Sequence, residues 1–169
     1  MKKLGLIAIV MLFAVSQLKA QVEIEDAKAK FIYNFTKFFE WPSHQRTGDF
    51  VIGVLGSGKM YNALSSFAEG KRVINQTITV KRFRNREEVT NCDMLFVSYL
   101  QVNDLQNIHE KAGRHVLLVS DSETGIQKGA AINFFLEGNR LRYEFKGTNA
   151  LKYGLKYHSK IAEMAAKAY

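Results

Sequence analysis

Apolar residues recur at spacings of three and four between residues 23 and 40, which is the pattern of a helix with one buried side. Ile24, Ala27 and Phe31 begin this stripe, and further phenylalanines continue it to Phe39. Pro42 cannot continue a helix, because its nitrogen carries no hydrogen. We therefore expect a helix from about residue 23 to residue 40.

Short apolar runs then alternate with helical patterns through residues 50–120. This alternation is typical of a parallel sheet with helices on both faces. The sequence predicts the α/β class, as a three-layer Rossmann-like domain whose mostly parallel sheet ends in an antiparallel hairpin and a C-terminal helix. The expected elements before the hairpin are a strand over 50–55, a helix over 61–67 ending at Gly70, a strand around Ile78, Val80 and Phe83, a strand over 94–99, a helix over 102–111 closed by Gly113, and a strand over 115–120.

The dipeptide Gly138-Asn139 predicts a two-residue hairpin turn between the apolar segments 131–136 and 140–145, because both residues tolerate positive φ. Such a turn fixes the register of the two strands. On the core face, the expected pairs are Leu136 with Leu141, Phe134 with Tyr143, and Ile132 with Phe145. On the other face we expect an ion pair of Glu137 with Arg140, a cation–π pair of Phe135 with Arg142, and a polar pair of Asn133 with Glu144.

The segment after the hairpin has a helical pattern that follows a capping residue at Thr148 or Asn149. We expect one final helix there, with a basic stripe on its outer side. The inward residues would be Leu151, Leu155, Ile161, Ala162 and Ala165, and the stripe would be Lys152, Lys156 and Lys160.

Residues 1–20 have the pattern of a secretory signal peptide, with a cationic start, an apolar run over 4–15 and a small residue at Ala20. The run is shorter than the roughly 20 residues that cross a bilayer, so we do not expect permanent membrane insertion. Cleavage after Ala20 would leave a single domain over 21–169, located in the periplasm.

The chain of 169 residues is 47% hydrophobic, and this share excludes a disordered protein. Its formal charge is +8. Without residues 1–20 the charge is 21 basic minus 16 acidic residues, or +5. An exported protein meets no chromosome, so we do not expect nucleic-acid binding. The single cysteine, Cys92, cannot form an internal disulfide. Its apolar surroundings favour burial, with an intermolecular bridge as the alternative.

Three motifs that could carry catalysis or ligand binding lack essential residues. The run from Gly53 to Met60 resembles a phosphate-binding loop, but Met60 replaces the hydroxyl residue that would reach magnesium. No G-x-S-x-G element is present, and no two histidines have metal-ligand spacing. We therefore predict no catalytic residues, no metal and no cofactor. The basic run over 81–86 favours a solvated strand end over a polyanion site.

Aromatic residues are unusually dense between Phe31 and Trp41, more than one helix face requires, since Tyr33 lies on the side of Lys37 and Glu40. One interpretation is a core helix with a Trp-Pro cap. The other is a helix that also meets a partner, because aromatic side chains are favoured anchors at interfaces.

Several motifs resemble the YfiR/HmsC family of exported bacterial proteins, and the resemblance covers nearly the whole mature chain. The most specific are the segment Tyr33-Asn34-Phe35 to Glu40-Trp41-Pro42 and the hairpin with Ile132-Asn133-Phe134 and Leu141-Arg142-Tyr143-Glu144. The family order also holds for residues 51–56, 92–96 and 120–121, with Gly125 and Gly129.

The resemblance implies a periplasmic regulator without a catalytic site, which binds the periplasmic part of an inner-membrane signalling protein. In the namesake this partner is a diguanylate cyclase held inactive, so that cyclic-di-GMP and biofilm formation fall. Family members with more cysteines form internal disulfides. Redox control of folding is not carried over, because this chain holds only Cys92.

Two functional hypotheses follow. The first is a repressor that docks on a diguanylate cyclase or another inner-membrane sensor, through the polar face of the hairpin. The second is a small-ligand-binding module that feeds a sensor such as a histidine kinase, with the turn at 56–58 and the strand ends as its crevice. A homodimer stays open in both. The candidate partner- or ligand-binding residues are Tyr33, Trp41, Asn133, Phe135, Arg142 and Glu144.

Overall fold

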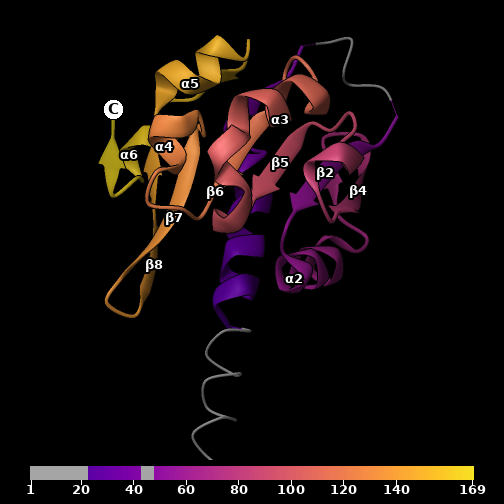
Figure 1. Cartoon of the computed structure of the whole chain (residues 1–169), viewed down its shortest axis with the longest axis horizontal. Coiled ribbons are helices and arrows are strands. Elements are labelled where there is room, and N and C mark those ends of the chain that lie inside the picture. The colour runs from indigo at the N-terminus through magenta and orange to yellow at the C-terminus, as the bar shows by residue number, and fades with distance from the viewer. Residues whose placement is uncertain (1–22, 43–47) are drawn as a thin grey trace, which may run out of the picture.

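The computed structural model describes residues 23–42 and 48–169, so the expected signal peptide lies outside the described residues. An eight-stranded sheet forms its centre, with helices on both faces (Figure 1). The elements in chain order are the helix over residues 23–35, β1 (Phe39–Glu40), β2 (Phe50–Leu55), α2 (Gly58–Ala68), β3 (Arg72–Val73), β4 (Gln76–Phe83), η2 (Arg86–Glu88), β5 (Met94–Val97), η3 (Tyr99–Asp104), α3 (Leu105–Ala112), β6 (Leu117–Ser120), α4 (Gly125–Lys128), β7 (Ile132–Glu137), β8 (Arg140–Phe145), α5 (Gly147–Lys152), β9 (Lys156–Tyr157), α6 (Lys160–Glu163) and β10 (Lys167–Ala168).

The strand order of the sheet is β10-β8-β7-β6-β5-β2-β4-β3. Five consecutive strands of this order run parallel to one another, namely β7, β6, β5, β2 and β4. β8 then pairs antiparallel with β7, β10 runs parallel to β8, and β3 pairs antiparallel with β4. The predicted α/β class, with a mostly parallel sheet that ends in an antiparallel hairpin, is confirmed.

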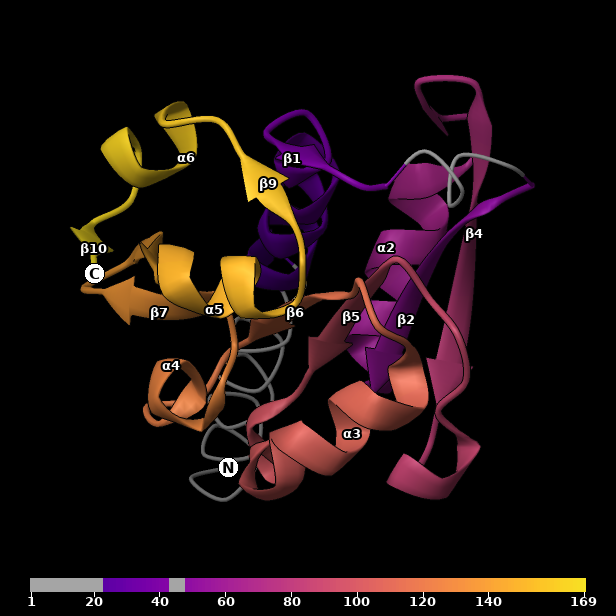
Figure 2. The ribbon, with the colours of Figure 1, turned by 90° about the horizontal axis from the view of Figure 1, so that it is seen from above.

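Two separate hydrophobic cores cover the two faces of the sheet. The first holds Ile32 and Phe35 of the N-terminal helix together with Leu64 of α2. The second holds Leu105 and Ile108 of α3. Figure 2 shows the N-terminal helix and α2 on one side of the strands, and α3 and α4 on the other. The central strands are therefore buried on both faces, which explains why they are continuous apolar runs in the sequence. Within the described ranges, every helix is too short or too polar to cross a bilayer.

The N-terminal helix ends at residue 35, so the prediction of a helix to residue 40 is wrong over its last five residues. The Thr36 hydroxyl donates to the carbonyl of Tyr33 at 2.7 Å, and a turn follows. Phe39 and Glu40 then form β1, which pairs antiparallel with Tyr157 and Lys156 of β9. Strand pairing with a distant segment, and not Pro42, therefore ends the helix.

The predicted elements over residues 50–120 are present with shifted ends. The strand over 50–55 is confirmed without change. The helix expected over 61–67 starts at Gly58, because the Ser57 hydroxyl accepts the N–H of Met60 and caps it. The helix expected over 102–111 is divided into η3 and α3, and Gly113 closes α3 at a φ of +122°.

The register of the hairpin is confirmed at all six predicted pairs. Its core face differs from the prediction at the tip. Phe134 and Tyr143 are buried, whereas Leu136 is 51% exposed and Leu141 is half-buried. The hairpin extends beyond the core, and its tip presents apolar side chains to the surroundings.

The prediction of one final helix is wrong, because the segment divides into α5, β9, α6 and β10. Gly154 adopts a φ of +72°, its N–H bonds to the Leu151 carbonyl, and the Leu155 N–H bonds to the Ala150 carbonyl. This is a Schellman ending, which stops α5. Leu155 and Ile161 are buried as predicted, but Leu151 is exposed.

The Cys92 thiol is buried, as its apolar neighbours predicted, and burial raises its pKa to about 12. We expect native protein at pH 8 to react with a thiol reagent at least ~100-fold more slowly than protein unfolded in guanidinium, because both access and thiolate are lacking. A colorimetric thiol assay measures both rates. Fast native labelling, or a disulfide-linked dimer after mild oxidation, would contradict the buried position.

Candidate functional site

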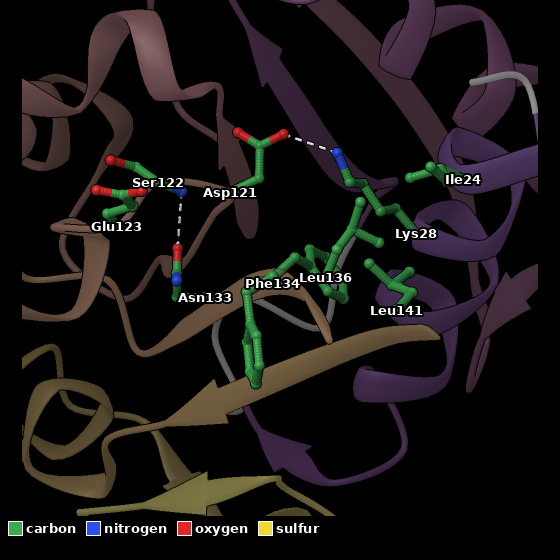
Figure 3. Close-up of a pocket in the computed structure, with 10 residues that line it drawn as sticks. Ile24, Lys28, Asp121, Ser122, Glu123, Asn133, Phe134, Leu136 and Leu141 are labelled. Carbon is green, nitrogen blue, oxygen red and sulfur yellow. Dashed lines mark hydrogen bonds and ion pairs between the residues drawn. The ribbon is translucent and has the colours of Figure 1, made fainter. Parts of the chain in front are cut away.

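A pocket lies at the carboxyl end of β6, where β7 continues beyond β6 and is paired with β8 alone among the described strands. The last residue of β6, Ser120, pairs with Asn133, and in the described part of the chain β7 has no strand on that side from Phe134 onward. The cavity volume is about 370 Å³. Figure 3 shows the residues that line it, from the N-terminal helix, the loop after β6 and the hairpin. They are Ile24, Lys28, Asp121, Ser122, Glu123, Asn133, Phe134, Phe135, Leu136 and Leu141.

Asn133 fixes the polar floor of this pocket. Its side-chain oxygen accepts the Ser120 hydroxyl at 2.7 Å and the Ser122 N–H at 2.9 Å, and the residue is 2% exposed. Gly125 lies against both side chains, since an added Cβ would collide with the Ser120 hydroxyl and the Asn133 oxygen. The loop after β6 is therefore held closely to β7 through one amide side chain.

Lys28 connects the N-terminal helix to the same loop by a buried ion pair. Its ammonium lies 2.7 Å from Asp121 Oδ2 and 3.3 Å from Glu25 Oε1. The other carboxylate oxygen of Asp121 accepts the Tyr99 N–H at 2.9 Å, so the loop after β6 is also tied to the loop after β5. Lys28 therefore positions the apolar and polar walls of the pocket relative to one another.

Burial raises the pKa of Glu25 above its ordinary value, although the ammonium of Lys28 acts against that shift. Its second oxygen, Oε2, is buried and has no partner among the described residues. A carboxyl whose folded pKa lies above its unfolded pKa binds more protons when folded. This group therefore weakens the fold as pH rises through the interval between those two values.

The opposite wall of the pocket is apolar and continues into a second cavity. Ile24, Leu136 and Leu141 line both spaces, and the second has a volume of about 230 Å³. Glu123 is exposed at the polar rim. Together the two cavities form an amphipathic depression that surrounds Leu136 at the tip of the hairpin.

The pocket has the composition of a binding site. None of the described residues that line it is a histidine or a cysteine, and both oxygens of Asp121 are engaged. Among the described residues, no three histidine, cysteine or carboxylate side chains gather closely enough to hold a metal ion. Apolar walls with a few placed polar groups are what small-molecule and peptide sites commonly offer.

Two of the predicted site residues line this pocket, and two lie beside it. Asn133 and Phe135 are lining residues. Arg142 and Glu144 lie opposite Phe135 and Asn133 in the register of β8, as predicted.

The side-chain contacts of the hairpin differ from those predicted, because the C-terminal strand β10 was not expected. Lys167 of β10 lies 5.5 Å from the centre of the Phe135 ring and 3.3 Å from Glu144 Oε1. Arg142 instead meets Glu137, with its Nε 3.6 Å from Oε2. The predicted pairs of Phe135 with Arg142 and Glu137 with Arg140 are therefore replaced by these contacts.

Tyr33 and Trp41 lie away from the pocket. The Tyr33 ring is half-buried and meets the edge of Phe67 at 5.9 Å between centroids. Trp41 is 7% exposed, donates its Nε1–H to the Asp93 carbonyl at 3.0 Å and meets the edge of Phe50 at 4.9 Å. Trp41 is therefore a core residue in this structure, and its ring is not presented to a partner.

The crevice expected at residues 56–58 is filled. A Cβ added at Gly56 would lie 2.8 Å from Ser98 Oγ and from Gln101 Cγ, so these two side chains occupy the space beside the turn. Sequence reasoning did not find Lys28 and Asp121. One signal was available, because Lys28 interrupts the inner side of an otherwise apolar helix and a buried lysine needs a carboxylate.

The chain matches the family model described as YfiR/HmsC-like over residues 25–166. The chain belongs to the YfiR/HmsC-like family. No curated protein gives a match. One similar solved structure is described as the ABC domain in complex with L-Trp from Streptococcus pneumonia, with 8% sequence identity and a TM-score of 0.48. The alignment covers 70% of this chain and 55% of that chain, so this chain spans little more than half of that protein's length.

Replacing Lys28 with methionine should leave the buried carboxylate of Glu25 and the partly buried carboxylate of Asp121 without their cation. We expect Lys28→Met to lower the free energy of unfolding by about 3–5 kcal/mol at pH 7. The loss should shrink towards pH 5, because the pKa of Glu25, which burial already raises, would rise further without the Lys28 ammonium. A raised carboxyl pKa favours the folded state as pH falls. Urea denaturation at both pH values measures this.

Lys30→Met is the matched control, since Lys30 is exposed on the same helix. It should change the free energy of unfolding by less than about 0.5 kcal/mol. If the two variants were equally stable at pH 7, the buried ion pair would have no structural importance.

Proposed function

We propose that this protein is a non-catalytic periplasmic regulator that docks on the periplasmic part of an inner-membrane signalling protein of the diguanylate cyclase type. Docking holds the enzyme inactive and lowers cyclic-di-GMP and biofilm formation. Membership of the YfiR/HmsC-like family carries this proposal. The secretory pattern of residues 1–20 supports the compartment, because only an exported domain meets the outer part of a sensor.

The tip and outer face of the hairpin supply the surface for docking. We define the hairpin surface as Leu136 and Leu141 on one face of the hairpin near its tip, with Phe135 and Arg142 on the opposite face. Leu136 is 51% exposed beside the pocket, and the Arg142 side chain is 47% exposed. Exposed apolar side chains within a polar rim are the usual anatomy of an interface that forms and dissociates.

Repression by docking needs no bond-making chemistry. A regulator that binds one conformation of the sensor more tightly than the other shifts the population towards that conformation. A coupling of about 1–3 kcal/mol corresponds to a change of roughly 5- to 150-fold. An interface of a few anchors can supply such a difference, since single residues at the centre of an interface often contribute more than ~2 kcal/mol.

The Arg142→Ala variant should lower capture of the sensor from crosslinked envelopes at least ~10-fold, which corresponds to about 1.4 kcal/mol of binding free energy. It should leave the fold intact, because the ion pair of Arg142 with Glu137 is exposed, and such a pair is worth at most about 1 kcal/mol. Quantitative crosslinking in cells and thermal unfolding of the purified variant measure the two effects.

Arg114→Ala is the control for loss of one positive charge, because Arg114 is exposed at the opposite end of the parallel strands, just before β6. It should capture the sensor as the natural protein does. Equal capture by both variants would refute docking through the hairpin surface. If Arg142→Ala does not fold, the same capture experiment uses Leu136→Glu, which places a charge at the exposed tip.

The second candidate function is a small-ligand-binding module that feeds a sensor such as a histidine kinase. The pocket of about 370 Å³ favours it, since small-molecule sites commonly enclose about 300–1,000 Å³. Its apolar wall and acidic rim would suit a compact molecule with an apolar group and an amino group.

Thermal-shift screening with apolar amines tests this second function. A ligand at 100 times its dissociation constant should raise Tm by about 5–10 °C, because it adds about 2.7 kcal/mol to the folded state. Leu141→Trp, which fills the pocket from its half-buried wall, should abolish the shift. A shift that persists in this variant would place the ligand elsewhere on the protein.

A further inference from the structure

The outer edge of β4 is largely unpaired within the described ranges. β2 covers the inner edge of β4 from Ile78 to Phe83. On the outer side, β3 pairs with Gln76 and Thr77 alone. Figure 2 shows β4 at the end of the sheet opposite to β10. The second half of β4 is therefore an open strand edge, and such an edge is a template for another strand.

Two backbone hydrogen bonds fix which residues of β4 point outward. The Phe83 carbonyl accepts the Gly56 N–H at 3.1 Å, so Phe83 faces the β2 side. The Ile78 N–H donates to the Lys71 carbonyl at 3.3 Å on the other side. Because the backbone direction alternates along a strand, Val80 and Arg82 direct their N–H and C=O groups outward.

The open edge is also strongly basic. Lys81, Arg82 and Arg84 are exposed, and none of them forms an ion pair within the described part of the chain. Two nearby carboxylates accept hydrogen bonds from uncharged donors. Asp49 accepts the Thr79 hydroxyl, and Glu88 accepts the Arg84 N–H. Three basic side chains without an ion-pair partner among the described residues therefore lie beside two residues with outward backbone groups, and they outnumber the two nearby carboxylates.

This charge decides between the possible occupants of the edge. A second copy paired through its own β4 would bring two basic edges side by side, and repulsion between like charges destabilises a strand pair. An acidic extended segment would bring complementary charge together with the N–H and C=O groups that β4 requires. We propose that the open edge of β4 binds an extended acidic segment of a partner protein by strand addition. This surface is separate from the hairpin surface and does not depend on the proposed function.

A direct test uses a short fluorescein-labelled peptide of alternating valine and glutamate and the mature protein. The peptide should bind in fluorescence anisotropy, and binding should weaken as salt rises. The same peptide with lysine in place of glutamate should bind at least ~10-fold more weakly, as should a peptide N-methylated at alternate amides, which keeps its charge but cannot donate to a strand.

Val80→Pro removes the outward N–H of Val80, which is not bonded to β2. Proline is tolerated at such edge positions. This variant should lose at least ~10-fold in peptide affinity. Arg114→Glu is the control for charge and should bind normally, and so should Arg142→Ala, which separates this surface from the hairpin.

A measurement on the natural protein covers the case in which Val80→Pro fails to fold. In its amide NMR spectrum, Val80 and Arg82 should exchange with solvent faster than Thr79 and Lys81, and peptide should slow that exchange. Equal binding of the N-methylated peptide, or protection at other strands only, would overturn strand addition. Tight binding of polyphosphate together with either result would identify a polyanion site instead and would equally overturn the proposal.

Discussion

Four aromatic rings at the base of the hairpin hold the N-terminal helix in place, and the pocket depends on them. Phe35 stacks on Phe134 at 5.8 Å between centroids and meets the edge of Tyr143 at 5.1 Å. Phe31 lies 5.9 Å from Tyr143. Ile24 and Lys28 lie on the same side of the helix at spacings of seven and three from Phe31, so the aromatic contact also places them over the pocket.

The central strands could be predicted because burial on both faces leaves a strong signal in the sequence. Every residue of β5 and β6 is buried. The hairpin register could be predicted because a two-residue turn permits one pairing. The pairing of β1 with β9 could not, since two strands of two residues from opposite ends of the chain have no local signature. That pairing also accounts for the early end of the N-terminal helix.

The candidate site was predicted in part, for a related reason. The opposing pairs on the hairpin follow from register, so Phe135 with Arg142 and Asn133 with Glu144 occupy the expected backbone positions. Their side-chain partners come from elements that register does not describe. Asn133 turns to the loop after β6, whereas β10 brings Lys167 to Phe135 and Glu144. Long side chains contact whichever neighbours lie close in space, whereas the sequence reveals only the neighbours within one hairpin.

The position of Trp41 has a practical consequence. It is the single tryptophan of the chain, and it lies in the core with its indole nitrogen bonded to a backbone carbonyl. Its ultraviolet emission therefore reports on the integrity of the folded interior. Because the ring lies away from the hairpin tip, that emission serves as an internal standard for the fold, while contacts made at the surface need a dye of their own.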